Sequence, residues 1–449
     1  MIKTLCTKLY GNSVVAANLY GQHRVPYLCE EKLATLRDAR LRATIRYAAD
    51  TVPYYRQLFR RDNIDPGSIR TAGDLERLPL LEKQEVRKNP ALFVSTHRRA
   101  RNCISFTTSG TTGAPLKVCH DPRSMLANMA FGERERRARS AVFGNNVKFR
   151  TLSIQFPGSI VKKVREFCQH MTFMPIQAER STVSILEPLE NVVSAINRYR
   201  PDVFISYGSY LEMLFRTVAS RETQMHLPRL ILYGGDGMSL ESREFIEEKF
   251  GVLVFSSYQA VESFKIGYFC EERRGFHLHA DLCHVKIIDA DGAKLPAGEK
   301  GEVVISNLVN RGTVLLNYRL GDIGSISSEY CTCGRTLPLL SELEGRAEDI
   351  IHLTDGGFVH PRAVWGVMKN RPEVLQYQLI QHEREQFELR LVTADRHSYQ
   401  GAITDITTGL QNLLGDSVKI HPGFYEELSR EASGKFRAVI ALSRQQEYR

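Results

Sequence analysis

The chain has 449 residues, 25% of them charged and 43% hydrophobic, and its 60 basic against 51 acidic residues give a formal net charge of +9. This length exceeds one usual core, so we expect two or more domains, and the ordinary composition excludes a disordered or fibrous protein. No apolar run approaches the roughly 20 residues that a transmembrane helix needs, so we expect no membrane span.

The cysteines and the start of the chain bear on its compartment. The nine cysteines are an odd number and mostly scattered, which argues against a disulfide framework and for a reducing compartment. The N-terminus lacks the charged and apolar regions of a convincing secretory signal. We therefore expect a cytoplasmic protein, with room for weak membrane or partner contact through residues 1–30.

The excess positive charge has two interpretations. It forms either a solvated basic surface or a surface that attracts small polyanions such as nucleotides or coenzyme A. The basic run Arg134–Arg139 reads as an exposed helix face and lacks the interleaved aromatic residues of a groove for single-stranded nucleic acid, so we expect no nucleic-acid partner.

The first elements along the chain are helices. Residues 30–62 show helical apolar spacing interrupted at Pro53, and a second helical segment with several prolines follows to residue 97. Beyond residue 100, short apolar runs alternate with amphipathic segments. We expect strands in 147–156, 201–208, 227–235 and 251–258, with helices in 187–200, 209–222 and 239–250. This alternation is typical of α/β units around a mainly parallel sheet.

The pattern changes twice in the second half of the chain. Residues 276–327 read as strands separated by a turn, so we expect a β-rich, more antiparallel subdomain over about 268–340. After Arg346 the pattern restarts as a small α+β unit. Its expected elements are a helix entered near 361, hairpin strands 374–383 and 386–394, a helix ended by Gly415, and strands or loops 417–423 and 435–442. The expected domains are 1–345 and 346–449.

A loop rich in threonine, serine and glycine follows the apolar run 103–106. Backbone N–H groups and hydroxyls in such a loop can surround phosphate oxygens, and glycines permit close approach. The spacing is not that of a Walker loop. From these residues alone, a phosphate cradle and a flexible surface loop both remain open.

The sequence of this loop resembles the signature of the adenylate-forming superfamily, which includes acyl-CoA synthetases, luciferases and nonribosomal adenylation domains. In that family the loop holds the phosphates of ATP. The residues implied are Thr108, Ser109, Gly110, Thr111, Thr112 and Gly113. The family's lysine corresponds to Lys117, one place later than usual.

Further motifs follow in the family's order. Residues 232–239 resemble the loop that lines the adenine pocket, and the positions implied there are Gly234, Gly235 and Asp236. Residues 256–263 resemble the next motif, which implies Tyr258 as the aromatic residue stacked on adenine and Glu262 as the Mg²⁺-binding carboxylate. Gln259 stands where the family usually has glycine.

Three motifs near the domain boundary and the C-terminus complete the resemblance. The first implies that Asp322 binds the ribose hydroxyls. The second places Arg346 near the ribose or phosphate, and puts Glu348 where the family has its hinge aspartate. The third implies that Lys435 is the lysine that bridges the carboxylate and the ribose-phosphate during adenylation.

Residues 52–90 and a set of cysteines resemble one branch, the phenylacetate–CoA ligases and related capsule-biosynthesis proteins. Cys270, His277, Cys331 and Cys333 would give a Cys₃His tetrahedral site that binds structural Zn²⁺. Buried free thiols are the alternative. Other nearby ligands compete for the same role: His279, Cys283 and His284.

The resemblance implies ATP- and Mg²⁺-dependent activation of a small-molecule carboxylic acid as an acyl-adenylate, then transfer to a thiol, with coenzyme A as the expected acceptor. A mobile C-terminal lid would turn about Glu348 between the two steps. Tyr207 and Gly234 are candidates for the acid pocket, although an aromatic residue there is also compatible with core packing. Two alternatives remain. The adenylate passes to an amine, a hydroxyl or a carrier protein, or a non-carboxylate group is activated; or the protein only binds nucleotide.

Overall fold

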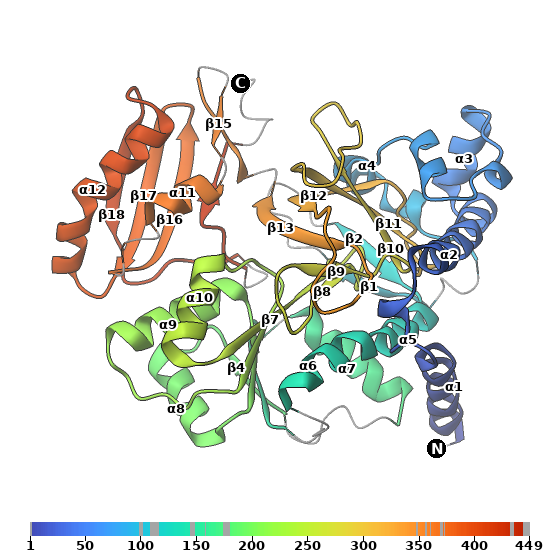
Figure 1. The fold of residues 1–449 in the computed structure, drawn as a ribbon, viewed down its shortest axis with the longest axis horizontal. Helices are drawn as coiled ribbons and strands as arrows, with labels where there is room; N and C mark the ends of the chain where they lie inside the picture. The colour runs from blue at the N-terminus through green and yellow to red at the C-terminus, as the bar shows by residue number, and fades with distance from the viewer. Residues whose placement is uncertain are drawn as a thin grey trace.

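The computed structural model describes residues 2–97, 102–107, 116–143, 149–157, 159–173, 180–346, 349–354, 357–359, 361–368, 371, 373–431 and 435–442. Its helices and strands form a large N-terminal part and a smaller C-terminal part that lie side by side (Figure 1). The fold is α/β, with one large mixed sheet and a separate small sheet.

The N-terminal third is helical, as the sequence predicts. Its elements are α1 (Ile2–Leu19), η1 (Val25–Tyr27), α2 (Glu30–Thr51), α3 (Pro53–Arg61), η2 (Pro66–Ser68), η3 (Gly73–Arg77), α4 (Lys83–Lys88) and η4 (Pro90–Phe93). The predicted break at Pro53 is confirmed, because this proline occupies the first turn of α3. Backbone N–H groups in the first turn make no hydrogen bond within the helix, so the missing N–H of proline costs nothing there. The segment after α3 consists mostly of short 3₁₀ turns rather than one helix.

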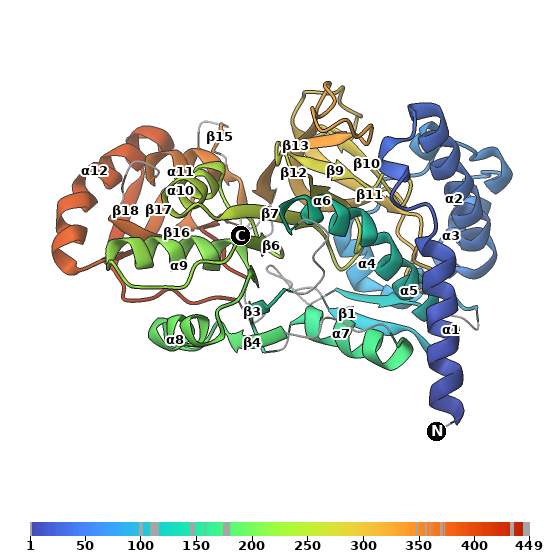
Figure 2. The same ribbon diagram turned by 60° about the horizontal axis from the view of Figure 1, so that its bottom comes forward.

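Helix α1 was not expected from the sequence. It lies along the N-terminal part next to α5 (Pro122–Phe131) and α7 (Ile160–Met171), as Figure 2 shows. Its buried residues include Gly11, Val14 and Val15, and the two valines pack with Leu126 and Ala130 of α5. Among the described helices, none combines the length and hydropathy that a membrane span requires.

One continuous eleven-stranded sheet organises the N-terminal part, in the order β4-β3-β5-β6-β7-β8-β9-β13-β12-β11-β10. Its parallel half contains β3 (Thr151–Gln155), β4 (Arg180–Ser184), β5 (Val203–Ser206), β6 (Leu230–Tyr233) and β7 (Leu253–Tyr258). Helices α8 (Leu189–Tyr199), α9 (Gly208–Ser220) and α10 (Leu240–Phe250) lie between successive strands β4 to β7 in the chain. The predicted alternation of strands and helices is therefore confirmed.

The other half of this sheet is antiparallel. It contains β8 (Gly267–Phe269), β9 (Phe276–Leu278), β10 (Cys283–Ile288), β11 (Gly301–Asn307), β12 (Tyr318–Ile326) and β13 (Leu339–Arg346). The antiparallel strands were predicted, but the sequence did not predict that they continue the same sheet as the parallel strands. Strand β7 joins the halves, because it pairs parallel with β6 and antiparallel with β8.

A smaller hairpin-like sheet and a further helix complete this part. The two-stranded sheet pairs β1 (Ile104–Thr107) with β2 (Lys117–His120), and α6 (Glu133–Phe143) follows α5. The loop predicted to hold phosphate, Thr108–Gly113, connects these two strands and lies outside the described residues.

The C-terminal part has its own sheet and core. Its elements are β14 (Ile351–His352), β15 (Phe358–Val359), α11 (Pro361–Met368), β16 (Val374–Glu383), β17 (Gln386–Thr393), α12 (Arg396–Leu414), β18 (Lys419–Phe424) and β19 (Val439–Ile440). The four-stranded sheet has the order β18-β17-β16-β19, and α12 ends at Gly415, where φ is +109°. The predicted hairpin and helices are confirmed. The apolar core of this part draws only on residues from 351 onwards.

The packing of α1 gives a test of the fold. A Cβ atom on Gly11 would lie 1.8 Å from the Met171 carbonyl oxygen. We expect Gly11→Ala to lower the melting temperature, because an overpacking cost of about 1–3 kcal/mol exceeds the gain of about 1 kcal/mol in helix propensity. Differential scanning fluorimetry measures this change. Ser13→Ala, on the exposed face of the same helix, is the matched control, and a Gly11→Ala variant as stable as wild type would contradict the close approach.

Candidate active site

A cavity of about 1300 Å³ is lined by residues from both parts of the chain. From the N-terminal part come Thr107, Tyr207, the loop Gly234–Met238, Tyr258, Glu262 and Asp322, and from the C-terminal part come Lys435, Phe436 and Arg437. Residues that are far apart in the sequence, and that were singled out separately by motif, therefore meet around one cavity.

Two carboxylates of the cavity are held by tyrosine hydroxyls. The Tyr258 hydroxyl donates to Asp322 Oδ2 at 2.6 Å, and the Tyr318 hydroxyl donates to Glu262 Oε1 at 3.1 Å. Burial raises the pKa of both tyrosines well above the usual value, and the neighbouring carboxylates raise it further. Both hydroxyls therefore remain protonated donors at neutral pH. Asp322 is also the cross-strand neighbour of Arg346 in the β12–β13 pairing.

The loop after β6 approaches the start of α9 closely. A Cβ atom on Gly208 would lie 2.4 Å from the Gly237 carbonyl oxygen, so only glycine fits without moving the backbone. Gly235 has a φ of +91° and packs against the Tyr207 ring. This contact brings Asp236 to the first turn of α9, where it accepts hydrogen bonds from Ser209 Oγ at 2.6 Å and Ser209 N at 3.2 Å.

The C-terminal part reaches the same aspartate. Arg430 Nη1 donates to Ser209 Oγ at 2.9 Å, and the Phe436 backbone N–H lies 3.4 Å from Asp236 Oδ2. Burial raises the pKa of Asp236, while the Ser209 hydrogen bond, Arg430 and Lys435 oppose that shift. Positive charge from one part thus compensates a partly buried carboxylate of the other.

Sequence reasoning missed several of these contacts. It did not single out Ser209 or Arg430, although Arg430 lies only five residues before the motif lysine. It also missed the ion pair in which Arg437 Nε donates to Asp349 Oδ1 at 2.8 Å. The signal available in the sequence was the pair of arginines near Lys435, Arg430 before it and Arg437 after it.

The remaining motif predictions have different outcomes. Thr108–Gly113 and Glu348 lie outside the described residues, and only the backbone of Arg346 is described. Lys117 begins β2 with an exposed side chain and is not part of the cavity lining. The roles predicted for all these residues stay predictions.

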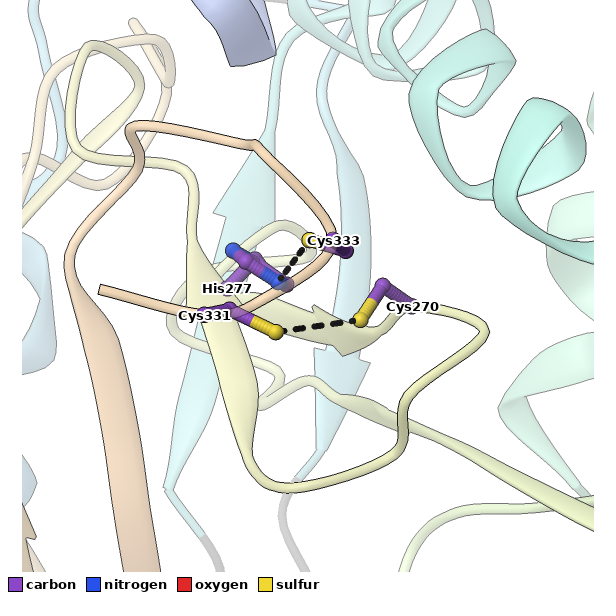
Figure 3. A group of neighbouring side chains, drawn as sticks. All are labelled: Cys270, His277, Cys331 and Cys333. Carbon is purple, nitrogen blue, oxygen red and sulfur yellow. Dashed lines mark hydrogen bonds between the residues drawn. The ribbon is translucent and has the colours of Figure 1, made fainter. Parts of the chain in front are cut away.

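A separate cluster joins β8, β9 and the segment that precedes β13 (Figure 3). The ligand atoms of Cys270, His277, Cys331 and Cys333 all lie within 4.8 Å of one another. Cys270 Sγ and Cys331 Sγ are 3.7 Å apart, and Cys333 Sγ is 3.3 Å from His277 Nε2. The sulfur separation is far longer than a disulfide bond of about 2.05 Å. The four predicted ligands therefore converge as free side chains.

The distances and chemistry of this cluster fit a tetrahedral metal site. Zinc–sulfur bonds of about 2.3 Å place two sulfur ligands about 3.8 Å apart in a tetrahedron. Burial lowers the pKa of His277 to about 4, so its ring is neutral at pH 7, as a metal ligand must be. Burial raises the pKa of Cys270 to about 12, a shift that a bound cation would oppose.

Family models match both parts of the chain that line the cavity. A family model described as "AMP-binding enzyme" matches residues 30–310, and one described as "CapK C-terminal domain" matches residues 351–441. The phenylacetate-coenzyme A ligase of Thermus thermophilus is 28% identical over 371 residues, and the match covers 81% of each chain. The phenylacetate-coenzyme A ligase of Aromatoleum evansii is 21% identical over 420 residues, with 92% of this chain and 89% of that ligase covered.

A solved structure shares the fold over nearly the whole chain. The 2-hydroxyisobutyryl-CoA ligase in its postadenylation state has a TM-score of 0.73 and 16% identity, with 95% of this chain and 92% of that chain covered. The same ligase in its thioesterification state has a TM-score of 0.60 and 17% identity, with 93% and 91% covered.

The contacts of Arg430 give a test of how the two parts dock. We expect Arg430→Met to keep much of the packing on the Tyr210 and Phe436 rings but to remove the charge and the bond to Ser209. Loss of this charged hydrogen bond should weaken docking by about 1–3 kcal/mol. Hydrogen exchange of residues 235–238 and small-angle scattering measure the change. Arg384→Met, at an exposed position, is the control, and unchanged exchange and scattering would contradict the docking role.

Proposed function

The chain belongs to the AMP-binding enzyme family, and we propose that it is an AMP-forming ligase that activates a carboxylic acid as an acyl-adenylate and transfers the acyl group to coenzyme A. The observation that carries the proposal is the convergence of Glu262, Asp322 and Lys435 on one cavity. The curated relatives that are phenylacetate-coenzyme A ligases support the same reaction type.

The chemistry explains why these residue types are needed. Activation joins two anions, the carboxylate and the α-phosphate of ATP, so charge has to be neutralised and the geometry fixed. We assign Lys435 to the developing charge at phosphorus and Asp322 to the ribose hydroxyls. Tyr258 would stack on adenine while its hydroxyl orients Asp322. Glu262 offers a buried carboxylate at the cavity wall, which suits Mg²⁺, and the bound ion would supply Lewis-acid charge stabilisation.

The arrangement of the two parts supports a two-step cycle. Lys435 lines the cavity, and the fold agrees better with the postadenylation state of 2-hydroxyisobutyryl-CoA ligase than with its thioesterification state. We propose that this arrangement serves adenylation, and that residues 346–449 then rotate as a lid about Glu348 to admit the acceptor. The loop Thr108–Gly113 would hold the phosphates beside Gly234, Gly235 and Asp236.

We also propose that the Cys270 cluster holds structural Zn²⁺. A closed Cys₃His set leaves no open position for substrate, so the ion would fix the antiparallel half of the sheet. We propose a cytoplasmic location, because the reaction needs ATP and coenzyme A, which the cytoplasm supplies, and because free cysteines are typical of a reducing compartment. A carrier protein, an amine or a hydroxyl compound remains the competing acceptor.

Pyrophosphate exchange with a panel of aryl and short-chain acids tests the first step. We expect Lys435→Ala to lower the rate of exchange by roughly 100- to 1000-fold, the usual effect of removing a group that stabilises charge in the transition state. Thioester formation from supplied acyl-adenylate should fall much less. Lys419→Ala, at an exposed position of β18, is the control.

Three outcomes of this assay contradict parts of the proposal. Equal losses of both steps in Lys435→Ala would refute the role of that lysine. AMP release that does not depend on coenzyme A would point to another acceptor. ATP binding without exchange or AMP release on any acid would refute the enzyme assignment.

Metal analysis of the purified protein tests the zinc site. We expect one zinc ion per chain in the wild type and a loss of zinc with a lower melting temperature in Cys331→Ser, because metal binding contributes folding free energy. Cys6→Ser changes an exposed cysteine outside the cluster and should keep both properties. Purified wild-type protein without stoichiometric zinc would contradict the site.

A further inference from the structure

The wall of the cavity formed by α6 carries two charged residues, Glu135 and Arg139, one helical turn apart. The Glu135 carboxylate is buried and already has close partners. Lys265 Nζ lies 2.5 Å from Oε1, and Ser257 Oγ donates to Oε2 at 3.3 Å. The adenylation chemistry assigned above uses neither α6 residue.

Arg139 is poorly compensated in this wall. Its guanidinium lies 3.8 Å from Glu135 and makes no hydrogen bond to another residue in the described part of the chain. His279 Nε2 is 3.4 Å from the same carboxylate, but burial lowers the pKa of His279 to about 4, so the ring is neutral. Among the described residues, one carboxylate therefore faces two cations, Lys265 and Arg139, and this part of the wall carries a surplus positive charge.

A second arginine adds to this surplus. Arg180, at the start of β4, has a buried Nε that finds no hydrogen-bond partner among the described residues. Burial lowers its pKa, and repulsion from Arg165 and Arg139 lowers it further. Arg180 is not part of the cavity lining, but an anion near Arg139 would reduce the mutual repulsion of the two guanidinium groups.

The surplus lies away from the carboxylates assigned to ATP. Ser257 and Tyr258 are successive residues of β7, so their side chains leave the strand on opposite faces. Tyr258 holds Asp322 on one face, and Ser257 contacts Glu135 on the other. Arg139 therefore belongs to a different part of the cavity from the Tyr258–Asp322 pair.

We propose that Arg139 binds a second anionic group of the acid substrate, remote from the carboxylate that is adenylated, so that the preferred substrates are dicarboxylic acids. This inference rests on the proposed adenylating function. The planar guanidinium can take a carboxylate through two parallel hydrogen bonds, which an uncharged end of the acid cannot form.

Paired acids test this specificity. The probes are adipate against hexanoate and 4-carboxyphenylacetate against phenylacetate, each measured by calorimetric binding and by pyrophosphate exchange. Arg139→Gln should weaken binding of the diacids roughly 10- to 100-fold, the loss expected for a hydrogen bond to a charged group, and leave the monoacids within about twofold. Arg139→Lys should give an intermediate loss.

Arg137→Gln is the matched control. Arg137 lies on the same helix, is exposed and pairs with Glu133 at 2.9 Å, outside the cavity lining. It should leave the binding of all four acids unchanged, and the melting temperatures of all variants report on folding.

The outcomes separate this inference from the proposed function. Wild-type protein that binds neither diacid more tightly than its monoacid partner would overturn the inference, as would equal losses for diacids and monoacids in Arg139→Gln. Exchange with monoacids alone would keep the enzyme assignment and remove the second site. Diacid binding that depends on Arg139, with no exchange on any acid, would keep the site and remove the enzyme assignment.

Discussion

The compensation of one partly buried carboxylate, that of Asp236, determines how the two parts of this protein meet. A carboxylate removed from water must be hydrogen-bonded or paired. Here the Ser209 hydroxyl relays between Asp236 and Arg430, and the backbone of Phe436 approaches from the C-terminal part. Because Lys435 is covalently next to Phe436, the same contacts carry the lysine into the cavity.

The position of this meeting point follows from the sheet. Strand β7 is parallel to β6 and antiparallel to β8, so the strand direction reverses in the sheet beside it. In open α/β sheets, ligands bind beyond the carboxyl ends of the parallel strands. Tyr258 ends β7 at this point, and the loop after β6 that carries Asp236 lies beside it. The antiparallel half supplies Asp322 from β12, which is why continuity of the sheet matters to the site.

Much of the fold and part of the site could be predicted from the sequence. The α/β alternation between 187 and 258 was readable because apolar runs and helical periodicity are local signals. Some residues of the cavity lining, among them Glu262, Asp322 and Lys435, were singled out through motifs, because the order of these motifs along the chain can be recognised even when the residues are far apart. Helix α1 was missed because its buried face is short, with Val14 and Val15 flanked by exposed residues.

Other features depend on tertiary contacts that no local pattern contains. The relay through Ser209 joins positions that are 221 residues apart in the chain. The sequence does not show that Lys265 forms an ion pair with Glu135, and it is this ion pair that leaves the charge of Arg139 poorly compensated. From the sequence, residues 134–139 read as an exposed basic helix face. That interpretation holds for Arg136 and Arg137, but it is wrong for Arg134, which is buried and pairs with Asp281, and Arg139 lines the cavity.

The contact between Gly208 and the Gly237 carbonyl has a consequence for evolutionary change. Position 208 accepts no side chain unless the opposite backbone moves, and that backbone carries Asp236 one residue earlier. Descendants of this chain can therefore alter this junction only through coordinated changes. Position 139 differs, because its side chain lines the cavity and a single substitution can change it. The junction around Gly208 should therefore change slowly in evolution, whereas the α6 wall that carries Arg139 can change more readily.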